Sequence, residues 1–287
     1  MLGILLIDKP LGVTSHDVVA MIRRKFNTKR VGHAGTLDPL ATGLLVIAVG
    51  PATRFLQYLP LEPKEYECQI KFGEETNTQD REGEVTATKP VPEDLAEKIQ
   101  ALIPQFSGEI QQIPPMYSAV KRAGKPLYFY ARQGEEVERE PRTVFIEALE
   151  FLGLEGDVAH VRVICSGGTY VRTLAHDMGQ ALGCGAHLHA LQRTQVGRFA
   201  IEDAFEIDDA TPEDLIPLRE ALFPMPEVIL NEGQERLARE GQVVRPPRPI
   251  DGKFAMLIDT EGNVMSVAES KAGMLQPLCV IPRELVP

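Results

Sequence analysis

One aspartate in a glycine-rich segment is the residue of this chain best placed to do chemistry. Asp38 is the only acid in the segment from Gly32 to Gly50, GHAGTLDPLATGLLVIAVG. The glycines and Pro39 predict a sharply bent loop that leads into an apolar strand from Leu44 to Val49. An aspartate mounted there can act as a nucleophile or a general base. An Asp-Pro pair can also do no more than start a turn, with its carboxylate accepting nearby backbone N–H groups.

A second charged residue, Arg172, indicates an anionic partner. A helix is predicted from about Tyr170 to Leu182, since apolar residues recur there at helical spacing. Arg172 lies in its first turn, where a cation opposes the helix dipole. A carboxylate or phosphate beside Arg172 would remove that conflict, and so would a solvated surface position.

The charge of the chain is unevenly distributed. A net charge of −11 disfavours a nucleic-acid partner, but two segments contain no acid at all. The first, residues 18–37, holds Arg23, Arg24, Lys25, Lys29 and Arg30; the second, residues 111–133, holds Lys121, Arg122, Lys125 and Arg132 among Tyr117, Tyr128, Phe129 and Tyr130. Cations interleaved with aromatic rings are typical of RNA-binding surfaces. Two ordinary solvated faces, the first at a helix C-terminus that favours cations, explain the same pattern.

The elements that must position these residues follow from hydrophobic periodicity. A strand from Gly3 to Ile7 is expected to precede a helix that runs from an N-cap at Ser15 to about Asn27. Residues 64–72 alternate as a strand, which turns Tyr66 inward or toward a cleft. The polar segment 73–83 predicts a mobile loop, residues 144–154 and 158–165 a hairpin, and residues 188–199 a strand that closes the same sheet.

The length of 287 residues leaves room for one large and one small domain. The composition changes after Pro226, where a short helix and three strands predict a β-rich unit of about sixty residues. We therefore expect domains at 1–222 and 223–287.

Several classes of protein are disfavoured by what the sequence lacks. The cysteines at 68, 165, 184 and 279 form no Cys-x-x-Cys pair, and His187 and His189 have no carboxylate or thiolate near them in sequence, so we predict neither a disulfide framework nor a metal site. Nucleotide-binding glycine loops and a Gly-x-Ser-x-Gly elbow are absent from the sequence. No signal peptide or membrane span is recognisable, and we expect a cytoplasmic protein.

Six ordered segments belong together: KPLGVTS at 9–15, GHAGTLDPLATG at 32–43, KEY at 64–66, IPPMYSAVK at 113–121, CSGGTYVRT at 165–173 and LQR at 191–193. In that order they resemble the motifs of the bacterial tRNA pseudouridine-55 synthase family, TruB type. The resemblance covers roughly the first two hundred residues, and the GH-x-GTLDP element alone is specific.

The resemblance implies an α+β pseudouridine synthase fold, with a mixed, largely antiparallel sheet flanked by helices. Residues 223–287 would form a small β-rich, PUA-like RNA-binding domain. The implied reaction flips uridine 55 out of the T-loop of tRNA, cleaves its N-glycosidic bond, turns the uracil and rejoins C1′ to C5. An isomerisation of this kind conserves atoms and oxidation state, so no cofactor is expected.

The resemblance also assigns roles to single residues. Asp38 would be the nucleophile, and Arg172 would pair with it, because a buried carboxylate protonates unless a cation keeps it charged. Tyr66 would stack on the flipped base, Leu191 would line a dry pocket, and His33 would hold the RNA loop that the uridine has left. Tyr66 is also a candidate for removing the C5 proton. Contacts to RNA are expected from Lys64, Arg23, Arg24, Lys25, Lys121 and Arg122.

Two positions depart from the family pattern. Ala34 stands where many relatives have threonine, and Gly167 where many have lysine, which removes a possible phosphate contact.

Three other functions fit parts of this pattern. An RNA-binding module or tRNA-folding helper would use the basic surfaces without needing Asp38 or Arg172. A glycosidase- or hydrolase-like enzyme would use Asp38 against a nucleoside and release free base. Archaeal-type relatives act through a guide RNA. Nothing in the sequence indicates a surface for a dedicated protein partner, so we expect a monomer that acts on the T-arm of tRNA without an obligatory protein partner.

Overall fold

The computed structural model describes residues 1–118 and 120–285. Ala119, within the segment 113–121, and residues 286–287 of the expected C-terminal domain lie outside the described residues. The chain divides into two compact units. The first unit comprises Met1–Pro39, Leu44–Pro60 and Ile201–Pro287, and the second comprises Leu40–Gly43 and Leu61–Ala200.

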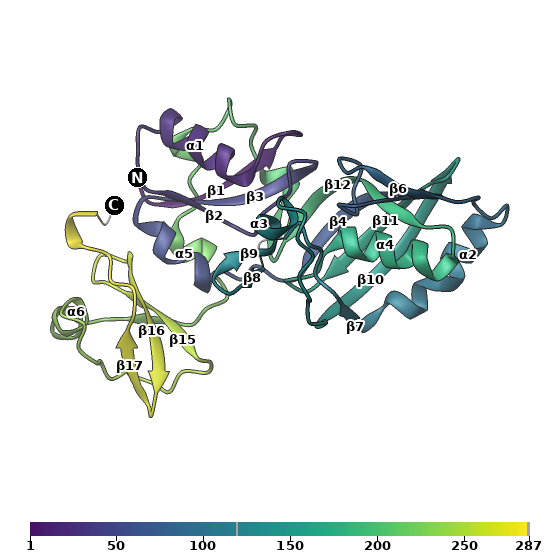
Figure 1. Ribbon diagram of the computed structural model, residues 1–287. Coiled ribbons are helices and arrows are strands. Elements are labelled where there is room, and N and C mark those ends of the chain that lie inside the picture. The colour runs from purple at the N-terminus through teal and green to yellow at the C-terminus, as the bar shows by residue number, and fades with distance from the viewer. Residues whose placement is uncertain (119, 286–287) are drawn as a thin grey trace. The chain divides into compact units, whose positions relative to one another are not determined.

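The N-terminal part of the first unit packs a helix on three strands. Strand β1 (Gly3–Lys9) neighbours β3 (Ala41–Val49), and β2 (Val31–Ala34) pairs antiparallel with β3. Helix α1 (Ser15–Lys25) shares one apolar cluster with these strands (Figure 1). The cluster consists mainly of Leu5, Ile7, Val18, Ile22, Phe26, Val31, Leu45, Ile47 and Val49. This packing confirms the amphipathic helix expected after residue 14.

The N-cap of α1 is Thr14, so the prediction of Ser15 at that position was wrong. Thr14 and Asp17 form a capping box, in which each side chain accepts the backbone N–H of the other residue. The hydroxyl of Ser15 is instead buried and engaged with the loop that carries Asp38.

The second unit is built on an antiparallel sheet in the order β12-β4-β11-β10-β7. The strands are β4 (Lys64–Phe72), β7 (Gly108–Gln112), β10 (Arg142–Glu155), β11 (Val158–Cys165) and β12 (Ala186–Val196), and β13 (Phe199–Ala200) pairs with the end of β12. The first residues of β3 add a parallel pairing, Ala41–Gly43 beside Leu191–Arg193. The sheet is therefore mixed and largely antiparallel, as predicted. Helices α2 (Leu95–Leu102) and α4 (Val171–Leu182) lie across one face of it (Figure 1).

A glycine makes the parallel pairing possible. Gly43 has φ +96°, and a Cβ there would lie 2.4 Å from the carbonyl oxygen of Arg193. Any side chain would push β3 away from β12.

Several elements of the second unit were not predicted. Residues 73–83 are not a loop throughout, because β5 (Glu74–Thr76) pairs with β6 (Val85–Thr88). The strand predicted at 188–199 is present as β12, but it lies between β3 and β4 and not at an edge of the sheet. The basic-aromatic segment contains the short strands β8 (Lys121–Arg122) and β9 (Lys125–Pro126) and the helix α3 (Leu127–Ala131).

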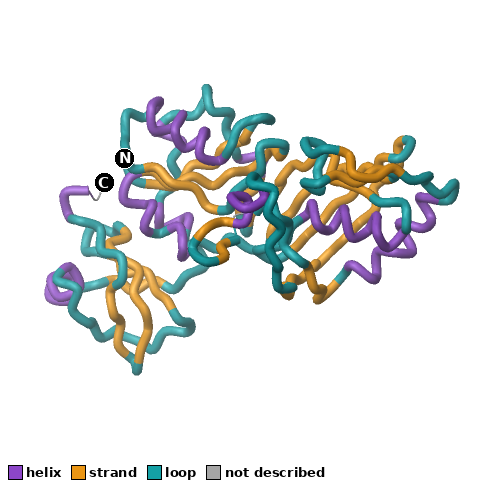
Figure 2. Tube along the Cα trace, in the orientation of Figure 1, coloured by secondary structure: helices purple, strands orange, loops and turns teal. Residues whose placement is uncertain are grey.

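The C-terminal part of the first unit holds a small separate sheet in the order β14-β15-β16-β17. Its strands are β14 (Glu227–Ile229), β15 (Phe254–Ile258), β16 (Val264–Lys271) and β17 (Met274–Pro277), and α6 (Glu232–Arg239) packs into its core (Figure 2). Helix α5 (Leu218–Ala221) precedes it. A small C-terminal sheet domain is thus confirmed, whereas the boundary at 222/223 and the PUA likeness stay predictions. Among the described residues, no helix is both long and apolar enough to cross a membrane.

Candidate active site

Two tethers from the β1–α1 turn hold the loop of Asp38. The buried Ser15 hydroxyl accepts the backbone N–H of Leu37 at 2.9 Å and donates to the Leu37 carbonyl at 3.2 Å. On the other side of the aspartate, Gly12 N–H donates to the Pro39 carbonyl at 2.8 Å. Asp38 itself is half-buried. Both neighbours of Asp38 in the chain are therefore fixed to one turn, which gives this carboxylate the rigid mount that the sequence suggested.

A buried lysine stabilises that turn. Lys9 is fully buried, and its ammonium group donates to the carbonyls of Val13 at 2.7 Å and Pro10 at 3.0 Å. A buried cation is tolerated only when acceptors surround it. The KPLGVTS segment thus shapes the support of the Asp38 loop.

His33 lies on β2, in the same unit as Asp38. It is half-buried and meets His16 of α1 edge to face, with 5.1 Å between the ring centres. The contact fixes the ring plane of His33 from the side of α1.

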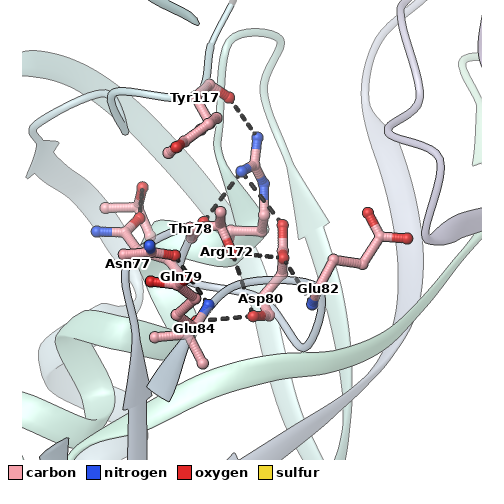
Figure 3. Close-up of polar contacts among 10 residues, drawn as sticks. Asn77, Thr78, Gln79, Asp80, Glu82, Glu84, Tyr117 and Arg172 are labelled. Carbon is pink, nitrogen blue, oxygen red and sulfur yellow. Dashed lines mark hydrogen bonds and ion pairs between the residues drawn. The ribbon is translucent and has the colours of Figure 1, made fainter. Parts of the chain in front are cut away.

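Arg172 has the anionic partner that its position in the helix demanded. It is 5% exposed, and its guanidinium lies 3.3 Å from the carboxylate of Asp80. The same guanidinium donates to the carbonyls of Thr78 at 3.1 Å and Tyr117 at 2.8 Å (Figure 3). Asp38 belongs to the other unit, so its predicted ion pair with Arg172 stays a prediction.

Asp80 is a site residue that the sequence analysis missed. It is 4% exposed and ends a turn in which its Oδ1 accepts the Thr78 hydroxyl at 2.6 Å and the Glu82 N–H at 3.1 Å. Arg81 N–H donates to the carbonyl of Leu188, so the turn is also fastened to β12. The signal available in the sequence was an acid in a polar segment of a chain that also has an arginine at the start of a helix, which is too general to select Asp80.

Tyr66 and Leu191 share one face of neighbouring strands. Leu191 of β12 pairs with Cys68 of β4, and Arg193 pairs with Tyr66. In an antiparallel pair, directly opposed residues point to the same face and diagonal neighbours lie within reach of aromatic side chains. Tyr66 is 7% exposed and Leu191 is 9% exposed. The structure therefore brings the two residues expected at the base pocket together, and adds the fully buried Arg193 beside them.

On the opposite face of these strands, one glutamate links three strands through its hydrogen bonds. Glu65 accepts a hydrogen bond from Arg162 of β11 at 2.6 Å and from the Thr194 hydroxyl of β12 at 2.9 Å. The hydrogen bond from Arg162 holds the pKa of Glu65 below its ordinary value. Three strands are thereby locked in the register that presents Tyr66.

The buried thiols near Tyr66 are not nucleophiles at neutral pH. Burial raises the pKa of Cys165 to about 11, and it raises the pKa of Cys68 further. Only a thiolate is a strong nucleophile. Among the described residues, no cluster of three or more His, Cys, Asp or Glu side chains could hold a metal ion.

The predicted RNA-binding cations differ in their surroundings. Arg23 donates to the carbonyl of Val31 at 2.9 Å, and Lys25 donates to the carbonyl of Asp208, whereas Arg24 is exposed without a side-chain partner among the described residues. Lys121 and Arg122 are exposed on β8, and Arg122 donates to the carbonyl of Glu138.

Two further cations make cation–π contacts with aromatic rings of α3. The ammonium of Lys125 lies 4.4 Å from the ring centre of Phe129, and Arg132 lies 5.5 Å from that of Tyr128. The interleaving of cations and rings in the sequence is therefore also a contact in space.

The departure at Gly167 has a structural counterpart. Its N–H donates to Glu62 Oε1 at 3.1 Å, and a Cβ added there would lie 2.3 Å from that same oxygen. The Glu62 carboxylate thus occupies the space that a side chain at 167 would need.

Comparisons with known proteins show which family the chain resembles. A model of the N-terminal domain of the TruB family of pseudouridylate synthases matches residues 23–171, and a model of the C-terminal domain of tRNA pseudouridylate synthase B matches residues 172–229. A tRNA pseudouridine synthase B of Stutzerimonas stutzeri is 44% identical over 98% of this chain and 96% of its own length. One of Opitutus terrae is 50% identical over 78% of this chain and 92% of its own length.

Solved structures agree with these relatives. A chain of a Cbf5–Nop10–Gar1 complex superposes with a TM-score of 0.73 at 28% identity, covering 98% of this chain and 86% of its own. A chain of an archaeal box H/ACA sRNP Nop10–Cbf5 complex gives 0.71 at 26% identity, with coverage of 98% and 87%. Both similarities extend over nearly the whole chain.

The Arg172–Asp80 pair predicts a large cost for removing one charge. Asp80→Asn leaves the buried guanidinium with carbonyl partners only, and we expect it to lower the free energy of unfolding by about 2–4 kcal/mol. Urea unfolding followed by circular dichroism measures this change. Glu75→Gln is the matched control, because Glu75 pairs with the half-exposed Lys89 and should contribute less than about 1 kcal/mol. Equal effects of the two substitutions would contradict the role assigned to Asp80.

Proposed function

The chain belongs to the TruB family of pseudouridylate synthases, and from this membership we propose that it isomerises uridine 55 in the T-loop of tRNA to pseudouridine. In this reaction the bond between N1 and C1′ breaks and a bond between C5 and C1′ forms. The C5 proton is lost and N1 gains one, so no electrons or atoms are exchanged with a cofactor. The observation that carries the proposal is the tethered Asp38 in the middle of the family's most specific motif.

In the proposed mechanism, Asp38 supplies the nucleophilic carboxylate. Its loop is fixed before the substrate arrives by Ser15 and Gly12, so that little freedom is lost in the transition state. Arg172 pairs with Asp38 and keeps it ionised in a dry site. Asp80 and two carbonyls already hold the guanidinium of Arg172, so its charge is offered in a fixed orientation.

The proposed base pocket uses the Tyr66 face of the β4–β12 pair. The ring of Tyr66 stacks on the flipped uracil, and Leu191 excludes water from it. A detached uracil is thereby kept from escaping before it turns. His33, held against His16, occupies the space in the RNA loop that the uridine vacates.

Extraction of the uridine costs roughly a few kcal/mol of unstacking, which protein contacts with the RNA must offset. We assign phosphate contacts to Arg24 and Lys121 and to the cations next to them in the chain, Arg23, Lys25 and Arg122. Lys64, a half-buried residue of β4, would contact the RNA near the base pocket. The C-terminal domain would add RNA-binding surface, in keeping with the proposed PUA likeness. Gly167 leaves this enzyme with one contact fewer than relatives that have lysine there.

The complexes that superpose on this chain contain Nop10, and one contains Gar1 as well. We propose that this chain instead acts as a monomer in the cytoplasm, without an obligatory protein partner or a guide RNA. In support, it aligns over 96% of the length of a relative named as a tRNA pseudouridine synthase in its own right.

The proposed activity is tested with a T-arm RNA that carries tritium at C5 of the target uracil. The protein alone should release tritium and convert one uridine to pseudouridine in the digested RNA. Free uracil as the product would favour the hydrolase. Tight binding without tritium release would favour an RNA-binding module, and activity that needs an added guide RNA would favour the archaeal-type mechanism.

Arg24 provides a test of the RNA surface that leaves the fold undisturbed. Arg24→Ala should weaken tRNA binding and reduce the slope of log K against log salt by about 0.7–0.9, the value for one phosphate contact. Filter binding at several salt concentrations measures both. Lys98→Ala is the control, because Lys98 is an exposed cation already paired with Asp94. An unchanged salt slope for Arg24→Ala would remove this residue from the RNA surface.

A further inference from the structure

Arg193 is the largest fully buried side chain of the described residues that the proposed mechanism leaves without a role. It is 1% exposed, on β12, and opposes Tyr66 on β4 in the strand register. Burying a charged guanidinium costs free energy unless the group is paired or hydrogen-bonded, so Arg193 needs a partner inside the protein.

Tyr66 supplies such an interaction. Burial lowers the pKa of Arg193, while a hydrogen bond with Tyr66 and the negative charge of Tyr66 in its ionised form act in the opposite direction. The interaction is reciprocal: a phenol oxygen that accepts from a guanidinium is stabilised most when it is ionised.

A second cation reinforces the effect. Lys64 lies on β4, two residues before Tyr66, and burial followed by the positive charge of Arg193 lowers its pKa. Glu62 acts against that shift, and the neighbouring Cys165 is a neutral thiol at pH 7. Arg193 and Lys64 disfavour one another's charge, and both lie on the Tyr66 side of the β4–β12 pair, where an anion such as the phenolate of Tyr66 offsets their repulsion.

We infer that Arg193 is a positioning residue that holds the phenol of Tyr66 and stabilises its phenolate, so that Tyr66 accepts the C5 proton in the last step of the isomerisation. The inference rests on the proposed function. It concerns Arg193, which does not touch the substrate and acts only through Tyr66.

The proton step balances without a co-reactant. Once C5 is bonded to C1′, it carries both the sugar and its original hydrogen. The phenolate oxygen takes that proton, and the C5–H electron pair forms the C5=C6 double bond. The electron pair of the C6=N1 bond moves onto N1, which takes up a proton. The phenol then returns its proton to solvent, so one proton has left C5 and one has been gained at N1.

The test uses the full chain, tRNA and single-turnover kinetics. Arg193→Gln should slow pseudouridine formation roughly 10–100-fold with little change in tRNA affinity, because it removes a cation from a proton-transfer step. Arg193→Lys keeps the charge and should recover most of the rate. Lys71→Gln is the matched control, since Lys71 is a half-buried cation on β4, on the face opposite to Tyr66, and pairs with Asp157. It should change the rate less than twofold.

Replacing Tyr66 with 3,5-difluorotyrosine distinguishes stabilisation of the phenolate by Arg193 from a merely structural role of Arg193. The phenol of difluorotyrosine is more acidic than that of tyrosine at nearly the same size. In the Arg193→Gln protein, this replacement should raise the rate of pseudouridine formation at least tenfold at neutral pH. A loss that fluorination does not relieve, a loss shared by Arg193→Lys, or a rate within twofold of wild type would overturn the inference. If wild-type protein forms no pseudouridine, the proposed function fails and the inference fails with it; every other result bears on Arg193 alone.

Discussion

The hydrogen bonds between the Ser15 hydroxyl and the backbone of Leu37 are the constraint on which the proposed chemistry depends. They fix a glycine-rich loop that would otherwise sample many conformations, and they do so from a helix packed in the core. Loss of this hydroxyl would leave a buried N–H and a buried carbonyl unsatisfied, at about 1–3 kcal/mol. Lys9 and the Gly12–Pro39 hydrogen bond extend the same support.

A second feature of the site is that Arg172 and Tyr66 are each held in place by other protein groups. Arg172 is fixed by Asp80 and by two carbonyls, and Tyr66 is fixed by strands that Glu65 ties together. The net charge of −11 does not oppose RNA binding in this arrangement, because the acid-free segments present cations locally. A pre-organised site of this kind spends little free energy on reorganisation during the reaction.

The sequence was sufficient for features with a local signal. Alternation along residues 64–72 placed Tyr66 on the buried face, and helical spacing placed Arg172 in the first turn of α4. The sequence was insufficient to predict the contacts of a side chain that had two possible partners, or whose partner lies far away along the chain. Ser15 looked like an N-cap but bonds a loop 22 residues away, and Asp80 looked like part of a solvated loop because its partner Arg172 is 92 positions further on. Arg193 belongs to the LQR segment at 191–193, but nothing in the sequence indicated that it lies beside Tyr66, since strand register alone sets it there.

The central claim is that Asp38 does the chemistry and contributes little to binding. The most direct measurement compares wild type with Asp38→Asn in a single-turnover assay of pseudouridine formation on tRNA, with tRNA affinity measured in parallel. We predict for Asp38→Asn a rate lower by a factor of about 10³ or more, equal to about 4 kcal/mol of transition-state stabilisation, at a nearly unchanged dissociation constant. A rate within tenfold of wild type, or a loss fully explained by weaker binding, would contradict it.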